Sequence, residues 1–117
     1  MTARIMRVGD APSYFPPLHN DVIARRLHGH EAGPTDAFWV GLSDYPPGSN
    51  VEEGPTAAEC VYVLLSGSLE LTADGHPYTL EAGDSVHFTK GTLRSVVNSS
   101  TVDAQLLVVI ATPKDPA

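Results

Sequence analysis

Arg94 is the residue in this sequence best suited to holding a small ligand. Its guanidinium presents a planar fork of donors that matches two oxygens at once, and it stays charged at any relevant pH. An arginine inside a fold therefore indicates a carboxylate or phosphate ligand, and we expect a small organic acid. The alternative is that Arg94 lies at the rim and pairs with Glu53, Glu59 or solvent, as most charged side chains do.

Cys60 and His87 are the two residues that could add chemistry to such a site. Cys60 would act as a nucleophile if Arg94 or His87 lowered its thiol pKa, although a free cysteine on a strand is more often a small buried hydrophobe. His87 lies in the apolar run Val86-His87-Phe88, where one imidazole can serve as a general acid or base. A histidine of the core or of an interface is the alternative.

The segment His28-Gly29-His30-Glu31 has the residue types of a metal motif. It follows a predicted strand within a Gly-rich stretch, so we interpret it as an exposed turn and not as a metal site. His19 and His76 are predicted to be surface residues.

Short strands separated by turns must position these residues, because ten Gly and ten Pro punctuate runs rich in Val, Leu, Tyr and Thr. The predicted strands are residues 21–27, 37–45, 59–65, 68–73, 77–80, 85–89, 94–98 and 104–111. This number of strands in a small chain favours a closed barrel or a sandwich. The pair Asp74-Gly75 suits a tight hairpin, so the strands on either side of it are expected to pair antiparallel.

Alternation along a strand predicts which side chains share a face. One predicted face carries Thr56, Cys60, Tyr62 and Leu64, and another carries Arg94, Val96 and Asn98. Trp39 and Tyr45 lie on one side of their strand and Phe38, Val40 and Leu42 on the other, so both sides of that strand are expected to be covered.

Length and composition restrict the fold and its partners. A chain of 117 residues suits a single domain, residues 1–117, with a Pro-rich N-terminal arm at 1–17 and a frayed tail at 113–117. A net charge of −7 disfavours nucleic acid and anionic membranes as partners. The single cysteine, Cys60, and the absence of a signal-like or membrane-spanning apolar run predict a cytoplasmic protein.

Residues 47–67 and 83–98 resemble the two signature motifs of the cupin superfamily. Gly48 and Gly67 frame the first motif, and Gly83 and Gly91 fall at the glycine positions of the second. Tyr62-Val63-Leu64 before Gly67 adds agreement outside the counted positions. The resemblance implies an all-β fold, the cupin-type double-stranded β-helix, or jelly-roll, barrel.

The same alignment places Gly54, Thr56, Cys60 and Arg94 where cupins carry their metal ligands. Because these side chains cannot supply three or four converging donors, and Arg94 would repel a cation, no metal and no other cofactor is predicted.

A one-residue slip of the alignment would instead place Glu53 and Glu59 at ligand positions. A metal held by atypical ligands, drawn from Glu52, Glu53, Glu59 and His87, is the least favoured hypothesis.

In cupins the two faces described above line the barrel interior, which implies the site. Predicted ligand-binding residues are Arg94, Thr56, Asn98 and Trp39, and the residues predicted to transfer protons are His87, Cys60 and Tyr62. The leading hypothesis is a metal-independent cupin that binds a small anionic organic molecule and catalyses an isomerase, lyase or cyclase step.

A non-catalytic binding or accessory cupin is the alternative, similar to degenerate members associated with ethanolamine utilisation. The outer face of a cupin sheet often packs against a second subunit, so the resemblance also implies a homodimer.

Overall fold

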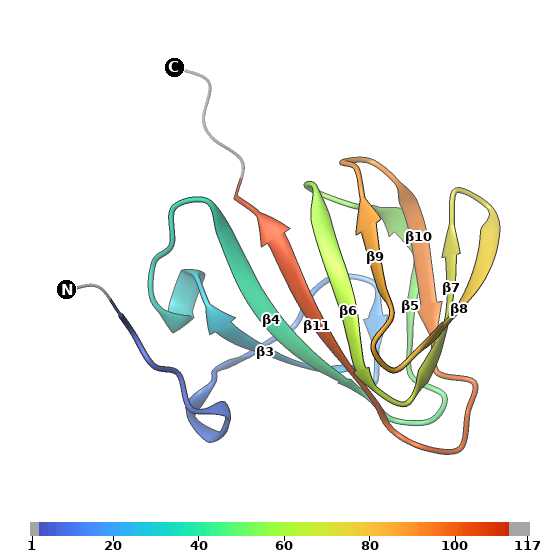
Figure 1. The fold of residues 1–117 in the computed structure, drawn as a ribbon, viewed down its shortest axis with the longest axis horizontal. Coiled ribbons are helices and arrows are strands. Elements are labelled where there is room, and N and C mark those ends of the chain that lie inside the picture. The colour runs from blue at the N-terminus through green and yellow to red at the C-terminus, as the bar shows by residue number, and fades with distance from the viewer. Residues whose placement is uncertain (1–2, 113–117) are drawn as a thin grey trace.

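The computed structural model describes residues 3–112, and most of them lie in strands (Figure 1). The strands are β1 (Ser13–Tyr14), β2 (His19–Asn20), β3 (Ile23–His28), β4 (Phe38–Tyr45), β5 (Asn50–Pro55), β6 (Cys60–Ser66), β7 (Ser68–Ala73), β8 (His76–Glu81), β9 (Ser85–Phe88), β10 (Leu93–Val97) and β11 (Ala104–Ala111). Two short 3-10 helices are present, η1 (Val8–Asp10) and η2 (His30–Ala32). Over this part of the chain no helix has the length and apolar character needed to cross a membrane. The predicted tail at 113–117 lies outside the described residues.

The strands form two antiparallel sheets arranged as a jelly roll, which confirms the predicted fold class. The six-stranded sheet has the order β1-β3-β4-β11-β6-β9, and the five-stranded sheet has the order β2-β5-β10-β7-β8. Strands distant in sequence are neighbours in both sheets. In particular, β11 lies between β4 and β6 and pairs with each of them (Figure 1).

The hairpin predicted at Asp74-Gly75 joins β7 to β8. Both residues have positive φ, 47° at Asp74 and 83° at Gly75, as a tight two-residue turn requires. The strands pair antiparallel from Ser68 opposite Glu81 to Ala73 opposite His76, which confirms the prediction.

Three strands were not predicted from the sequence. Strands β1 and β2 contain two residues each, too few to show alternation. The sequence of β5 is Asn-Val-Glu-Glu-Gly-Pro, and apart from the valine these residue types are rare in strands. Because β1 pairs with β3 and β2 pairs with β5, residues 15–18 pass from the edge of one sheet to the edge of the other.

Alternation along the inner strands builds a core between the two sheets. On β6, Cys60, Tyr62 and Leu64 are buried while Val61 and Val63 are partly exposed. The buried cluster also takes residues from β7, β8, β9, β10 and β11, namely Leu69, Leu71, Leu80, Phe88, Val96, Ala104, Leu106 and Val108. Most of these apolar side chains pack one end of the barrel, while Cys60, Tyr62 and Val108 also line a cavity at the other end.

Candidate functional site

A cavity of about 570 Å³ occupies the end of the barrel where β6 begins and β11 ends. Cys60 and Tyr62 line it from β6, whereas Leu64, two residues further on, belongs to the packed core. Val108 and Ile110 line it from β11. Pockets of roughly 300 to 1,000 Å³ are the usual size for small-molecule sites, so this cavity can enclose a ligand.

Arg94 lies in this cavity with part of its hydrogen-bonding capacity unused. Its Nε donates to the hydroxyl of Tyr62 at 3.2 Å, and its Nη1 is buried without a hydrogen-bond partner among the described residues. No carboxylate of residues 3–112 forms a salt bridge with it. A buried cation without a counter-charge is unfavourable, so a ligand that supplies a hydrogen-bond acceptor to Arg94 would be bound favourably here.

Tyr62 and Cys60 flank Arg94 on the wall formed by β6. Burial raises the pKa of the Tyr62 hydroxyl, and the neighbouring Arg94 opposes that shift. Burial likewise raises the pKa of the Cys60 thiol, again opposed by Arg94. Both groups therefore remain protonated near neutral pH, which argues against Cys60 as a thiolate nucleophile and leaves Tyr62 as a neutral proton donor.

An aromatic cluster forms the other side of the cavity. Trp39 and Tyr14 meet edge to face with ring centroids 5.7 Å apart. The guanidinium of Arg26 lies 3.9 Å from the ring centroid of Tyr14 and 4.2 Å from that of Trp39. Its Nε also donates to Glu31 at 3.0 Å, so the charge of Arg26, unlike that of Arg94, is compensated within the protein.

Gly41 on β4 explains how Tyr14 fits into this wall. A Cβ at this position would lie 2.8 Å from the Tyr14 hydroxyl oxygen and 3.2 Å from the Trp39 ring. The missing side chain therefore makes room for the aromatic pair. Burial raises the pKa of Tyr14 to about 12, so this hydroxyl is also protonated.

Two histidines that sequence reasoning set aside line the cavity. His30 is exposed, as predicted for this turn, and begins η2, but its ring packs edge to face on Trp39 with centroids 5.7 Å apart. The turn folds back because Gly29 adopts φ 95° and passes so close to Trp39 that a Cβ there would overlap the Trp39 Cβ. The surface prediction for His19 was wrong, because the crossing at residues 15–18 turns it into the cavity, where it is half-buried and its Nδ1 donates to the Pro17 carbonyl at 2.8 Å.

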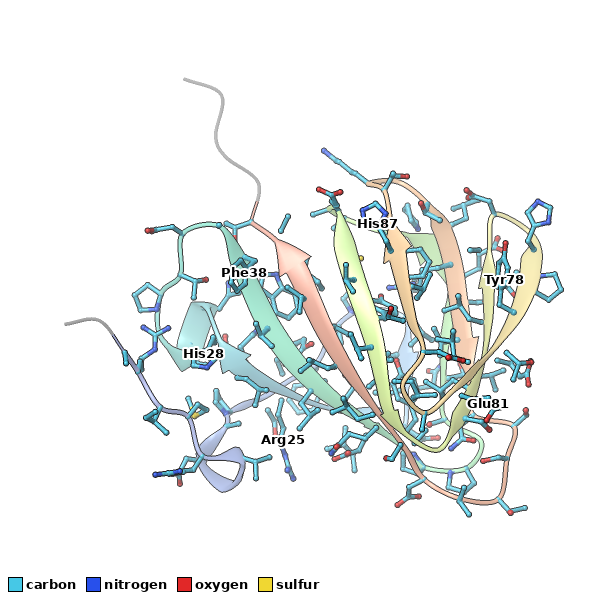
Figure 2. All side chains as sticks on the ribbon, viewed as in Figure 1. Arg25, His28, Phe38, Tyr78, Glu81 and His87 are labelled. Carbon is cyan, nitrogen blue, oxygen red and sulfur yellow. The ribbon has the colours of Figure 1, made fainter. Side chains whose placement is uncertain are left out.

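His87 lies outside the cavity. It faces Val61 across β9 and β6, on the outer side of the sheet, whereas the neighbouring pair Cys60 and Phe88 points inward. Its Nε2 is 2.7 Å from a carboxylate oxygen of Glu59, and both side chains are more than half exposed. His87 stands on β9 beside β6 in Figure 2. The structure therefore does not bring it to Arg94, Tyr62 or Cys60.

Asn98 and Thr56, the other predicted ligand-binding residues, have their polar groups occupied. The Asn98 side chain is fully buried, donates to the carbonyls of Tyr45 at 2.7 Å and Val102 at 2.8 Å, and does not line the cavity. Thr56 does line it, but its hydroxyl donates to the Thr89 carbonyl at 2.9 Å and accepts from a backbone amide. Of the four predicted binding residues, two are placed to contact a ligand, because Arg94 has an unpartnered Nη1 and Trp39 has a partly exposed ring.

The positions that would hold a metal by the sequence alignment do not form a donor set for a divalent cation. Gly54 has no side chain, the Thr56 hydroxyl is committed to backbone, the Cys60 thiol is protonated, and Arg94 is itself a cation.

The carboxylates of the atypical-ligand hypothesis point elsewhere. Glu59 bonds to His87 on the outer face, and Glu52 accepts from Asn20 at 3.1 Å. Within residues 3–112 no group of three or more His, Cys, Asp or Glu side chains comes together to hold a metal.

Comparison with known proteins identifies similar chains. A family model described as "Cupin domain" matches residues 41–110. A Mycobacterium tuberculosis protein named "Beta-D-galactosidase Rv1717" is 48% identical over 110 residues, which covers 94% of this chain and 95% of that protein.

Solved structures show the same fold at low identity. The polyketide cyclase RemF from Streptomyces resistomycificus superposes with a TM-score of 0.81 at 19% identity, over 99% of this chain and 83% of that chain. A predicted oxalate decarboxylase from Thermotoga maritima gives a TM-score of 0.76 at 21% identity, over 94% and 100% of the two chains.

Proposed function

Because this chain belongs to the cupin domain family, we propose that it is a metal-independent cupin enzyme that binds a small molecule in the barrel cavity and cleaves a β-D-galactoside. The relative named as a β-D-galactosidase spans nearly the whole of both chains, and this supports the reaction class. The main structural support for the site is the hydrogen bond of 3.2 Å from Arg94 Nε to the Tyr62 hydroxyl, inside a cavity large enough for a small ligand.

We assign a separate catalytic or binding role to each of three residues in the cavity. Tyr62 accepts a hydrogen bond from Arg94, so its own proton is free to be donated to the oxygen that leaves when a glycosidic bond breaks. Arg94 stabilises the phenolate that results. Trp39 offers a partly exposed ring against which the apolar face of a sugar can pack.

Metal independence is part of the proposal and rests on the donor set described above. Arg94 stands at one of the aligned ligand positions and would repel a divalent cation, and the hydroxyl of Thr56 is already satisfied by backbone groups. Equal activity before and after chelator treatment, with metal content measured on the same sample, is the expected result.

Release of nitrophenol from nitrophenyl β-D-galactopyranoside tests the reaction. The wild-type protein should turn it over, and Tyr62→Phe should lower kcat by about 100-fold or more because the proton donor is lost. Tyr78→Phe is the matched control, because Tyr78 is exposed on β8 and does not line the cavity. No release by wild type, or equal kcat for wild type and Tyr62→Phe, would contradict the proposal.

Binding of a small organic acid is the second candidate function, either without chemistry or with an isomerase, lyase or cyclase step. Two observations favour it. Arg94 has an unpartnered Nη1, and the described lining residues include none of the carboxylates on which most glycosidases depend. Titration of organic acids against wild type and Arg94→Ala would support it if binding occurred and required Arg94, in a protein that showed no turnover of galactosides.

A further inference from the structure

The charge inside the cavity differs from that in most enzymes that catalyse the proposed reaction. Most glycosidases place two carboxylates beside the scissile bond, because the transition state develops positive charge on the sugar. The titratable residues that line this cavity are tyrosines, histidines, Cys60 and two arginines, with no Asp or Glu among the described ones. A neutral galactoside bound here would leave the positive charge of Arg94 without a counter-charge.

The uncompensated charge can be assigned to one residue. Arg26 forms an ion pair with Glu31 and packs against two aromatic rings, so it needs no counter-charge from a ligand. Arg94 has neither an ion pair nor a partner for Nη1 among residues 3–112. In a protein with a net charge of −7, this local excess of positive charge marks the place where an anionic group is expected.

We infer that the substrate supplies the missing carboxylate, and that it is an acidic galactoside of the uronic acid class whose carboxylate pairs with Arg94. This inference rests on the proposed function and narrows its substrate class. A planar guanidinium with a free Nη1 suits a carboxylate, and Trp39 in the same cavity suits the sugar ring that carries it.

The reaction then balances with the groups present. The bond from the anomeric carbon to the leaving oxygen breaks, and that oxygen takes the proton of Tyr62. A water oxygen bonds to the anomeric carbon, and its proton returns to the Tyr62 phenolate, so one water is consumed in total. The carboxylate of the substrate, held beside the ring by Arg94, partly offsets the positive charge that develops there. A neutral proton donor such as Tyr62 also avoids the repulsion that a second carboxylate would exert on an anionic substrate.

Calorimetric titration of the full chain with two sugars tests the inference. Methyl β-D-galactopyranosiduronate should bind at least about tenfold more tightly than methyl β-D-galactopyranoside. Arg94→Met should abolish this difference. Arg25→Met, a change of the same kind on β3 at a residue that does not line the cavity, should preserve it. Thermal unfolding of each variant shows whether it is folded.

The outcomes separate this inference from the proposed function. Equal affinity for the two sugars, or a preference for the acid that survives Arg94→Met, would overturn the inference even if the neutral nitrophenyl galactoside is cleaved. Binding of the uronoside through Arg94 without cleavage would support the anion site and remove the hydrolase proposal. Binding of a simple dicarboxylate through Arg94, with no binding of either sugar, would overturn both.

Discussion

Arg94 donates a hydrogen bond of 3.2 Å from its Nε to the Tyr62 hydroxyl, while its buried Nη1 has no partner among the described residues. The structure therefore holds a charge in the barrel that it does not fully satisfy. Removing such a charge often costs nothing in stability, because the desolvation penalty disappears with it.

Arg94→Met is expected to leave the free energy of unfolding unchanged or to raise it by about 1 to 2 kcal/mol, although ligand binding is lost. Urea denaturation of wild type and variant, with Arg25→Met as the control for loss of one positive charge, measures the effect. Destabilisation of Arg94→Met by more than about 1 kcal/mol would show that the protein itself satisfies the guanidinium.

Asn98→Ala should be among the most destabilising single substitutions in the barrel, by about 3 kcal/mol. The Asn98 amide donates to the buried carbonyl of Tyr45 and to that of Val102, and its oxygen accepts from the backbone and hydroxyl of Ser100. Chemical denaturation measures the loss. Ser100→Ala, which removes the hydroxyl and keeps the buried amide, should cost about 1 kcal/mol, and an equal cost for both variants would contradict the argument.

His87→Ala is expected to leave turnover and ligand affinity unchanged, because His87 pairs with Glu59 on the outer face of the sheet. Exposed ion pairs contribute little, so the free energy of unfolding should fall by no more than about 0.5 kcal/mol, and Glu59→Gln should behave in the same way. Steady-state kinetics and thermal unfolding of both variants measure this. A tenfold loss of activity in His87→Ala alone would restore His87 as a catalytic residue.

His19 makes stability depend on pH in a defined direction. Burial lowers its pKa below the ordinary value of 6.5, the hydrogen bond to the Pro17 carbonyl opposes this shift, and the positive charge of Arg94 adds a smaller lowering. As the pH falls below 6.5, the unfolded chain takes up this proton before the folded one does, so the contribution of His19 to stability is complete above that pH and is lost below it. The free energy of unfolding of His19→Gln should therefore fall less than that of wild type between about pH 7.5 and about pH 5. Parallel curves for the two proteins would rule out this role.

The homodimer stays a prediction, and the structure suggests where to test it. The outward side chains of β4, β6 and β11 form an apolar surface that includes Val61, Val63, Leu107 and Val109, and Phe38 at its edge is about half exposed. Light scattering coupled to gel filtration should give the mass of two chains for wild type and of one chain for Val63→Lys. A monomeric wild type at micromolar concentration would contradict the prediction.

The fold could be predicted further than the site. Seven of the eight predicted strands match observed ones to within one residue at each end, and 68–73 and 104–111 match in full, because those runs alternate and are bounded by turns. The weak strands β1, β2 and β5 were missed because two residues, or a run with Glu-Glu-Gly-Pro, carry no such pattern.

The alternation of side chains along β6 correctly predicted that Cys60, Tyr62 and Leu64 share a buried face. Arg94 and Trp39, which were predicted to bind a ligand, both line the cavity. The side of β9 on which His87 falls depends on the register between β9 and β6, and alternation along β9 alone does not reveal that register. Two features of the chain path bring further residues into the cavity wall. The crossing at residues 15–18 places Tyr14 and His19 there, and the close approach of Gly29 to Trp39 places His30 there. Neither feature has a local signal in the sequence.

The place of β11 between β4 and β6 has a consequence for how the barrel is made in a cell. Its partners are both synthesised before it, yet they do not pair with each other, so the six-stranded sheet cannot be completed until residues 104–111 have been made. The inward side chains Leu106 and Val108 complete the core in the same step. Until then the nascent chain presents two open strand edges to chaperones and to other chains, so the cavity cannot close before this strand has been added.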